Sequence, residues 1–176
     1  LKVMRDITMP AFEIAEDAAN ETYVFTTTPI TVDANGVPSG SNWIPVCKNI
    51  SALADAYSGH IDGNDNTISG LRILHNADYT GFIGFMYDDA SIKNINFDDA
   101  VVCGTNTTAK DLGTGIAVGR SQDGSIIENV NVTASYVSGV NNVGGIVGRN
   151  YTRGNNVHNE ALSFVKNCTT DANTVF

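Results

Sequence analysis

Two short modules alternate through the second half of the chain, and this repeat constrains the fold more than any other feature. The glycine-rich module occurs at residues 81–85, 115–120 and 144–149. The second module places an asparagine among apolar residues and occurs at 92–97, 127–132 and, in shorter form, 165–169. Self-similarity at a period of about 20 to 50 residues indicates a repeat architecture.

The repeat is irregular in length but regular in content. Equivalent positions are 24 residues apart from Gly70 to Asn94, 35 from Asn94 to Asn129 and 38 from Asn129 to Asn167. A β-sandwich or a propeller also repeats strand, turn and strand. Variable loops on a constant frame favour a solenoid instead. We therefore predict an all-β chain folded as a solenoid of the parallel β-helix type.

The asparagine modules predict a bend and a ladder. Strict alternation would place Ile92 on the opposite face from Ile95 and Phe97, so a bend near Asn94 is needed to turn all three inward. Asparagine tolerates the left-handed conformation such a bend uses. Stacked amides can also hydrogen-bond from one coil to the next. The expected ladder consists of Asn94, Asn129 and Asn167.

The glycine modules predict tight backbone geometry. Glycine is expected where φ is positive or where two chain segments approach too closely for a Cβ. This applies to Gly84, Gly119 and Gly148, which recur at equivalent places. Their spacing lacks the pattern and the Lys-Ser/Thr ending of a phosphate-binding loop, so the role expected for them is structural.

The first part of the chain does not repeat. We expect residues 1–43 to form an N-terminal cap over residues 44–176, with both parts in one structural domain, because a solenoid end must be covered. Residues 11–19 follow Pro10 and predict a short helix, whereas 23–32 are rich in Thr and aromatic residues and predict one or two strands.

Composition excludes several function classes. Charged residues make up 16% of the chain, the net charge is −9 and the sequence pI is about 4.5. This charge argues against a nucleic-acid binder and against a polybasic membrane anchor. The sequence contains no apolar run of the length a transmembrane helix needs. We therefore expect no nucleic-acid partner and no transmembrane segment.

Several segments together resemble the GLUG-motif repeat proteins. The resemblance begins with Asn42-Trp43-Ile44-Pro45-Val46, continues through residues 57–73 and then follows the three paired modules, covering about residues 42–170. Ile61 replaces the family's usual Phe, Asp65 its usual Gly, and Ala117-Val118 interrupt the second glycine module.

The resemblance implies a right-handed parallel β-helix on a bacterial cell surface, within larger adhesins or surface-attached proteases. The family motif is structural, so the resemblance transfers no catalytic residue. It implies an extracellular, non-enzymatic module that presents loops or spaces another domain. A purely structural spacer of a larger surface or viral fibre is an alternative. The expected partners are a glycan or protein ligand on a surface, or neighbouring domains of a larger chain.

One segment has the appearance of half a calcium site. Asp62, Asn64 and Asn66 place oxygen ligands at alternate positions. Thr67 stands where such a loop needs Gly, and Ile73 stands where its bidentate Glu belongs. A tight Asx-type turn is therefore expected here, and neither a metal nor a cofactor is predicted.

Acidic residues offer a second hypothesis. Asp62 together with Asp88 and Asp89 could place two carboxylates at the spacing used for glycoside cleavage. Parallel β-helices can host enzymes that cleave polysaccharides, but fold does not imply function. Solvated turn residues are the alternative interpretation of these aspartates.

Tyrosines near the expected loops are the candidate ligand-binding residues. Their rings are apolar on the face and polar at the tip, which suits contacts with sugars or proteins. The candidates are Tyr79, Tyr87, Tyr136 and Tyr151. Packing in the core is the alternative for such rings, and it applies equally to Trp43.

Overall fold

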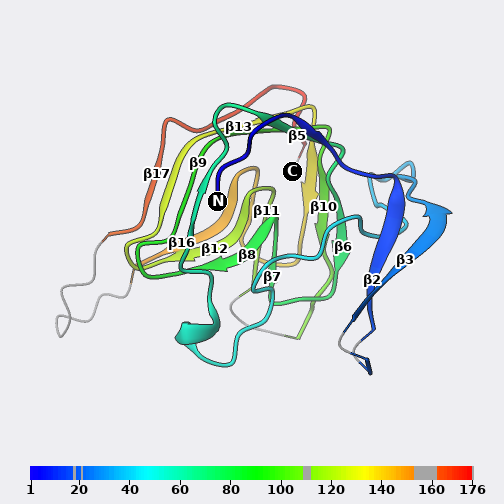
Figure 1. Cartoon of the computed structure of the whole chain (residues 1–176), viewed down its shortest axis with the longest axis horizontal. Coiled ribbons are helices and arrows are strands. Elements are labelled where there is room, and N and C mark those ends of the chain that lie inside the picture. The colour runs from blue at the N-terminus through cyan, green and yellow to red at the C-terminus, as the bar shows by residue number, and fades with distance from the viewer. Residues whose placement is uncertain (18, 21, 109–111, 153–161, 176) are drawn as a thin grey trace.

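The predicted all-β class is confirmed, and most strands pair in parallel (Figure 1). The computed structural model describes residues 1–17, 19–20, 22–108, 112–152 and 162–175. Sheet 1 contains β1 (Ile7–Thr8), β4 (His60–Asp62), β5 (Thr67–Ser69), β9 (Ser91–Asp98), β13 (Ile126–Thr133), β17 (Phe164–Lys166) and β18 (Thr169–Thr170).

Three smaller parallel sheets follow it along the chain. Sheet 2 contains β6 (Arg72–His75), β10 (Val101–Gly104) and β14 (Tyr136–Ser138). Sheet 3 contains β7 (Tyr79–Thr80), β11 (Gly113–Gly115) and β15 (Val143–Gly144). Sheet 4 contains β8 (Ile83–Met86), β12 (Val118–Gln122) and β16 (Val147–Tyr151). The one 3₁₀ helix of the described residues is Leu53–Asp55.

The chain visits these four sheets in a constant order. From β4 to β16 it passes through sheets 1, 2, 3 and 4 three times, and it returns to sheet 1 at β17. Every pairing within the four sheets is parallel. Between β9 and β13 the partners are 35 residues apart, as in Ile95 beside Val130. Each circuit therefore lies on the preceding one (Figure 1).

Stacked aliphatic side chains fill the space between the sheets. Ile61, Ile92 and Ile127 form one such column, because each pairs with the next across sheet 1. Ile92 and Ile127 have no exposed surface, and Ile61 is 6% exposed. Burial of such a side chain contributes roughly 1.5–3 kcal/mol. Identical positions in successive circuits thus build a single core.

The predicted bend at the asparagine is confirmed. Asn94 has a φ of 53°, and Ile92, Ile95 and Phe97 on both sides of it are all buried. Asn129 and Asn167 share the same φ of 53°. This left-handed residue reverses the alternation, so apolar side chains before and after it can face the core.

The amides of this bend connect neighbouring circuits. Asn129 Nδ2 donates to Asn94 Oδ1 at 2.8 Å, and Asn94 Nδ2 donates to Asp62 Oδ1 at 3.1 Å. A parallel ladder runs through Asn131 Nδ2, which donates to Asn96 Oδ1 at 2.9 Å. Among the described residues, the Asn167 side chain makes no hydrogen bond.

The recurring glycines lie where backbones nearly touch. A Cβ on Gly119 would lie 2.7 Å from the Thr80 nitrogen, and one on Gly84 would lie 2.7 Å from the Lys48 Cα. A Cβ on Gly148 would lie 2.3 Å from the Thr114 nitrogen. Close approach, and not positive φ, explains glycine at these three positions.

One secondary-structure element expected in the N-terminal segment is different in the structure. The helix predicted for 11–19 is wrong: β2 (Phe12–Asp17) occupies this stretch and pairs antiparallel with β3 (Thr22–Pro29). Alternating large side chains in both strands favour the hairpin over a helix. The strand expected within 23–32 is confirmed as β3. Before the hairpin, β1 pairs with β5 and extends sheet 1.

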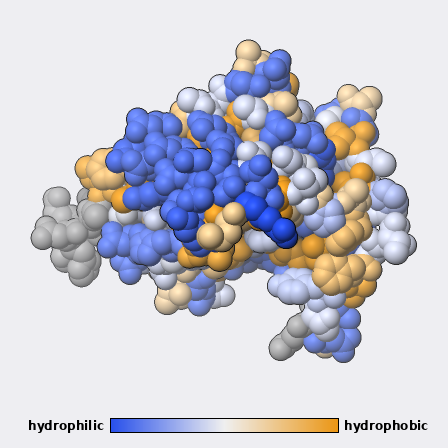
Figure 2. Space-filling view, turned by 45° about the horizontal axis from the view of Figure 1, so that its top comes forward, coloured by the Kyte–Doolittle hydropathy of each residue, from blue (hydrophilic) through white to orange (hydrophobic). Residues whose placement is uncertain are grey.

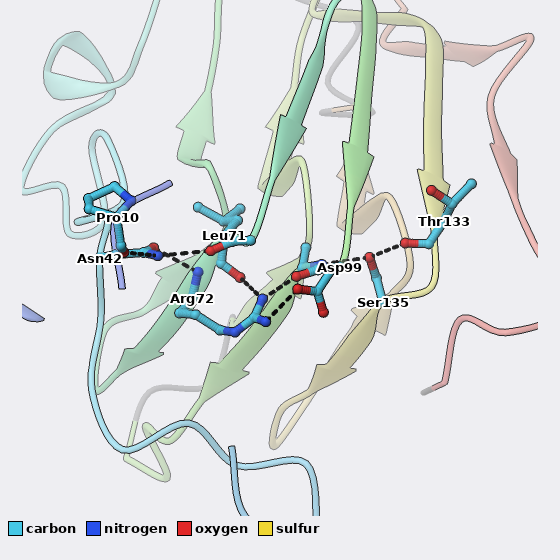
Figure 3. Close-up of polar contacts among 9 residues, drawn as sticks. Pro10, Asn42, Leu71, Arg72, Asp99, Thr133 and Ser135 are labelled. Carbon is cyan, nitrogen blue, oxygen red and sulfur yellow. Dashed lines mark hydrogen bonds and ion pairs between the residues drawn. The ribbon is translucent and has the colours of Figure 1, made fainter. Parts of the chain in front are cut away.

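A buried asparagine fastens this N-terminal segment to the stack (Figure 3). Asn42 is 1% exposed. Its Nδ2 donates to the carbonyl oxygens of Pro10 at 2.9 Å and Gly70 at 2.8 Å, and its Oδ1 accepts from the Arg72 backbone at 2.8 Å. The Arg72 guanidinium then forms an ion pair of 2.7 Å with Asp99 of the next circuit.

The outer face of sheet 1 is polar, and Figure 2 shows it as a broad hydrophilic expanse. Glu128 forms ion pairs with Lys93 at 3.4 Å and with Lys166 at 2.9 Å, on the strands either side of it. The hydrogen bond from Lys166 and the further bond and charge of Lys93 lower the pKa of Glu128. The carboxylate is thus favoured in the folded protein.

Asn42→Ala should destabilise the fold strongly. The substitution leaves one backbone donor and two backbone acceptors without their side-chain partner, and each buried orphan costs about 1–3 kcal/mol. We expect a loss of about 3 kcal/mol in the free energy of unfolding, measured by urea denaturation. Asn35→Ala, in an exposed turn, is the control and should change it by less than about 0.5 kcal/mol.

Asn129 and Asn131 should respond oppositely to alanine and glycine. Both donate to a ladder, but only Asn129 is left-handed. Asn129→Ala should therefore be less stable than Asn129→Gly by about 1 kcal/mol. At position 131, with an extended backbone, Gly should be the worse by about 0.5–1 kcal/mol. If the alanine and glycine variants have the same order of thermal stability at both positions, the left-handed bend at Asn129 is refuted.

Acidification should remove the stabilisation that comes from Glu128. A carboxylate with a lowered folded pKa stabilises above its unfolded pKa, and this contribution is lost as pH falls through the folded pKa. Glu128→Gln should lower the Tm at neutral pH, and the difference from the unmodified protein should vanish in acid. Asp89→Asn removes the same charge from an exposed turn and should leave the Tm at neutral pH nearly unchanged.

Candidate functional site

A hollow lies between the β2–β3 hairpin and the segment that precedes β4. Its volume is about 280 Å³. One wall comes from the hairpin and the other from the segment that precedes β4. The lining residues are Ile14, Tyr23, Phe25, Trp43, Ile44 and Val46. The hairpin projects beside the stack in Figure 1, and Figure 2 shows hydrophobic surface on that side of the molecule.

The hairpin wall follows from strand register. Phe25 pairs with Ile14 and Tyr23 pairs with Glu16, so these four side chains lie on one face of the hairpin. Phe12 packs edge-on against Phe25, with ring centroids 5.6 Å apart. Tyr23 remains 59% exposed and Phe25 64% exposed. Two aromatic rings therefore face a hollow that no described side chain fills.

The opposite wall is rigid. The Trp43 ring stacks on Phe82 with centroids 4.7 Å apart and an interplanar angle of 14°. Its Nε1 donates to the Phe82 carbonyl oxygen at 2.8 Å. Trp43 is thus both a packing residue of the stack and a wall of the hollow, which combines the two roles considered for it.

Polar groups border the hollow on one side. A second recess of about 390 Å³ shares Tyr23, Ile44 and Val46 with it and adds Glu16, Lys48 and Asn49. Lys48 Nζ forms an ion pair with Glu16 and lies 3.3 Å from His75 Nε2. Burial and the charge of Lys48 lower the pKa of His75, whereas Glu16 raises it. The border thus has paired charges beside an apolar floor.

Three of the four candidate tyrosines gather on the outer face of sheet 4, away from this hollow. Tyr79 is 8% exposed, and its hydroxyl accepts from Arg120 at 3.1 Å. The Arg120 guanidinium also lies 5.4 Å from the Tyr151 ring centroid. Tyr87 packs against the buried cluster that contains Tyr79 and Phe85. These rings serve largely as packing around a buried arginine.

Tyr136 lies elsewhere. It begins β14 in sheet 2, and its ring covers Gly36, where a Cβ would lie 2.9 Å from the ring. Gly36 has a φ of +81°, so the turn and the ring fit together only with glycine. The four tyrosines therefore do not form one surface.

The candidate carboxylates occupy different places. Asp62 lies in β4 beside Lys93, whereas Asp88 and Asp89 form the exposed left-handed turn between β8 and β9. Asp62 Oδ1 accepts from the Asn64 backbone at 2.9 Å and from Asn94. These bonds lower the pKa of Asp62. None of the three aspartates lines the hollow beside the hairpin.

The half-calcium segment folds as a turn. Asn64 and Asp65 have positive φ, and Asn66 Nδ2 donates to the carbonyl oxygens of Val3 and Gly63 at 3.1 and 3.0 Å. The amide of Asn66 is therefore engaged with backbone. Within the described part of the chain, no group of three or more His, Cys, Asp or Glu side chains could hold a metal ion.

Sequence reasoning missed Tyr23 and Phe25 as candidate binding residues. Both lie in a non-repeating segment, and only the hairpin register places them on one face. The available signal was the order Tyr23, Val24 and Phe25, because the two rings at alternate positions of a strand lie on the same face.

Comparisons with known proteins give one curated relative. Halomucin of Haloquadratum walsbyi is 34% identical over 117 residues, which is 66% of this chain. The matched part is 1% of halomucin, so this chain spans a small fraction of that protein. No protein-family profile matches the chain, and no solved structure does. No described helix has the length and apolar character needed to cross a membrane.

Proposed function

We propose that this protein is a non-enzymatic, surface-associated module that binds a glycan in the hollow beside its β2–β3 hairpin. The observation that carries the proposal is the pair of exposed rings, Tyr23 and Phe25, opposite a wall braced by Trp43. Recesses with an apolar, aromatic lining and a few polar groups are typical ligand sites.

A glycan suits the chemistry of this recess. The aromatic faces can cover the C–H face of a sugar ring, and Glu16, Lys48 and Asn49 at the border can hydrogen-bond its hydroxyls. Because Lys48 is already paired with Glu16 and the net charge is −9, an uncharged glycan is favoured over an acidic one.

The scaffold is proposed to be a right-handed parallel β-helix of the GLUG-like type. Three circuits through the same four sheets, parallel pairing and stacked amides support this architecture. A rigid stack allows loops and hairpins to vary without disturbing the core. Such a scaffold would equally serve as a spacer between domains of a larger surface protein.

The likeness to halomucin supports a surface-associated, extracellular location. The match extends over 117 residues of this chain. The proposed bacterial origin rests on the GLUG-like motifs alone. A glycan-cleaving enzyme that uses Asp62, Asp88 or Asp89 is the less supported function, because these residues lie outside the hollow.

A glycan array should find saturable binding that depends on the hairpin face. In the Tyr23→Ala/Phe25→Ala double variant we expect a loss of affinity of about tenfold or more, since ring contacts contribute roughly 0.5–1.5 kcal/mol each. Val24→Ala removes an exposed side chain from the opposite face of β3 and should bind normally.

A product assay on the same glycans separates binding from cleavage. The proposal predicts intact glycans after incubation. Cleavage that is lost in an Asp62→Ala, Asp88→Ala or Asp89→Ala variant would replace it with the enzymatic function. Absence of saturable binding on the array would also contradict it and leave the spacer role.

A further inference from the structure

The outer half of the β2–β3 hairpin is fastened to the rest of the protein by one charged contact. The base of the hairpin is anchored by the buried amide of Asn42. Further along β2, the Ile14 N–H donates to the Ser41 carbonyl oxygen at 2.6 Å. Beyond Ile14, the ion pair between Glu16 and Lys48 is the one hydrogen bond or ion pair that joins the described residues of the hairpin to the segment that precedes β4.

Open space surrounds this outer half. Recesses of about 280, 220 and 390 Å³ lie between the hairpin and the segment that precedes β4, and Ile44 lines all three. The second of them reaches His75 at the end of β6, which lies beside the hairpin in Figure 1. The strand register shifts between Phe12 and Glu13, and such bulges disrupt the ladder and bend the strand. The hairpin thus has a point of bending between its base and the ion pair.

The Lys48 ammonium connects this ion pair to a partly buried histidine. Lys48 Nζ lies 3.3 Å from His75 Nε2 while it is paired with Glu16. An ammonium group can only donate, so Nε2 must accept, and the proton of the neutral ring is on Nδ1. Nδ1 is buried and has no hydrogen-bond partner among the described residues. The arrangement therefore requires a neutral His75.

A second proton on this ring would be placed against a positive charge, because it would go to Nε2. The charged residues around the ring are Lys48, Glu13 and Glu16. Its neighbours in the segment before β4 and in β10 are uncharged, namely residues 39–41 and Gly104. Burial and Lys48 lower the pKa of His75, and Glu16 opposes them. Protonation would thus break the bond from Lys48 and leave two cations in competition for Glu16.

We propose that protonation of His75 releases the outer half of the β2–β3 hairpin from Lys48 and opens the hollow, so that the hollow holds a ligand at neutral pH and releases it in acid. The movement follows from the contacts of Lys48, whereas the release of a glycan rests on the proposed function. Tyr23 pairs with Glu16 across the hairpin, so separation of Glu16 from Lys48 also moves this ring away from Trp43. The hollow would then lose one of its walls.

Proton linkage gives the direction and the pH range of this change. Opening returns His75 to water and separates it from Lys48, so its pKa returns toward the ordinary value of about 6.5. A group whose pKa is lower in the closed state takes up its proton preferentially in the open state. The ratio of closed to open hairpin should therefore be constant above the ordinary pKa. Below it the ratio should fall by up to about tenfold per pH unit, until the lowered pKa is reached.

The single tryptophan of the chain reports this movement without any glycan. Trp43 lines the hollow together with Tyr23 and Phe25 of the hairpin. We would measure quenching of its fluorescence by acrylamide from about pH 7.5 to about pH 5.5, a range in which histidine titrates. Circular dichroism at each pH would verify that the stack stays folded. We expect quenching to increase in acid, because the ring loses the cover of the hairpin.

Three variants locate the effect at His75. His75→Gln cannot take up a proton and should keep quenching at its neutral-pH level throughout the range. His60→Gln removes a histidine of β4 that lies outside the recesses and should retain the transition of the unmodified chain. Glu16→Gln removes the charge that Lys48 holds and should show raised quenching already at neutral pH.

The outcomes separate the switch from the proposed function. Quenching that does not change with pH in the unmodified chain, a transition that persists in His75→Gln, or normal quenching of Glu16→Gln at neutral pH would each overturn the proposal. A transition that depends on His75 in a chain that binds no glycan would support the switch and contradict only the proposed function.

Discussion

The constant register between β9 and β13 is the constraint on which the rest of this structure depends. Each residue of β9 lies beside the residue 35 positions later in β13. This alignment places Ile95 on Val130 in the core and Asn96 on Asn131 at the surface. A shift by one residue would exchange buried and exposed faces along both strands. The core, the amide ladders and the ion pairs of Glu128 with Lys93 and Lys166 therefore all require the same alignment.

Stacking of like residues explains why so few residue types recur. Aliphatic side chains stack without strain at each inward position, whereas asparagine amides can both donate and accept along a ladder. In sheet 1 the charged residues alternate in sign from strand to strand, as Lys93, Glu128 and Lys166 do. Asn42 performs a different task, because it joins the non-repeating segment to the first circuit. Repetition stabilises the stack, and the buried amide of Asn42, together with the pairing of β1 with β5, attaches the non-repeating segment.

The repeating part of the fold could be predicted because its determinants are local. Asn94 and its neighbours within three residues specify the bend, and recurrence of the pattern specifies the parallel stack. The hairpin could not be predicted in the same way, since residues 11–19 carry a composition compatible with a helix and acquire strand geometry by pairing with β3. Its face toward Trp43 depends on contacts between separate segments.

The exposure of the tyrosines could not be predicted from their local sequence either. Tyr79 follows a turn and has the sequence context of an exposed ring, yet Phe85 and Arg120 from other strands enclose it. Tyr23 and Phe25 are 59% and 64% exposed, and they lie outside the repeats. Which residues of a repeat scaffold are free to bind a ligand depends on which segment covers each face. The periodicity of the sequence does not encode this coverage.

The register itself can be measured most directly by NMR. Nuclear Overhauser contacts between backbone protons of β9 and β13 report which residues are neighbours across the sheet. We expect contacts between residues 35 apart, with Ile95 beside Val130 and Asn96 beside Asn131, in the pattern of parallel strands. An antiparallel pattern, or a constant offset other than 35, would contradict it.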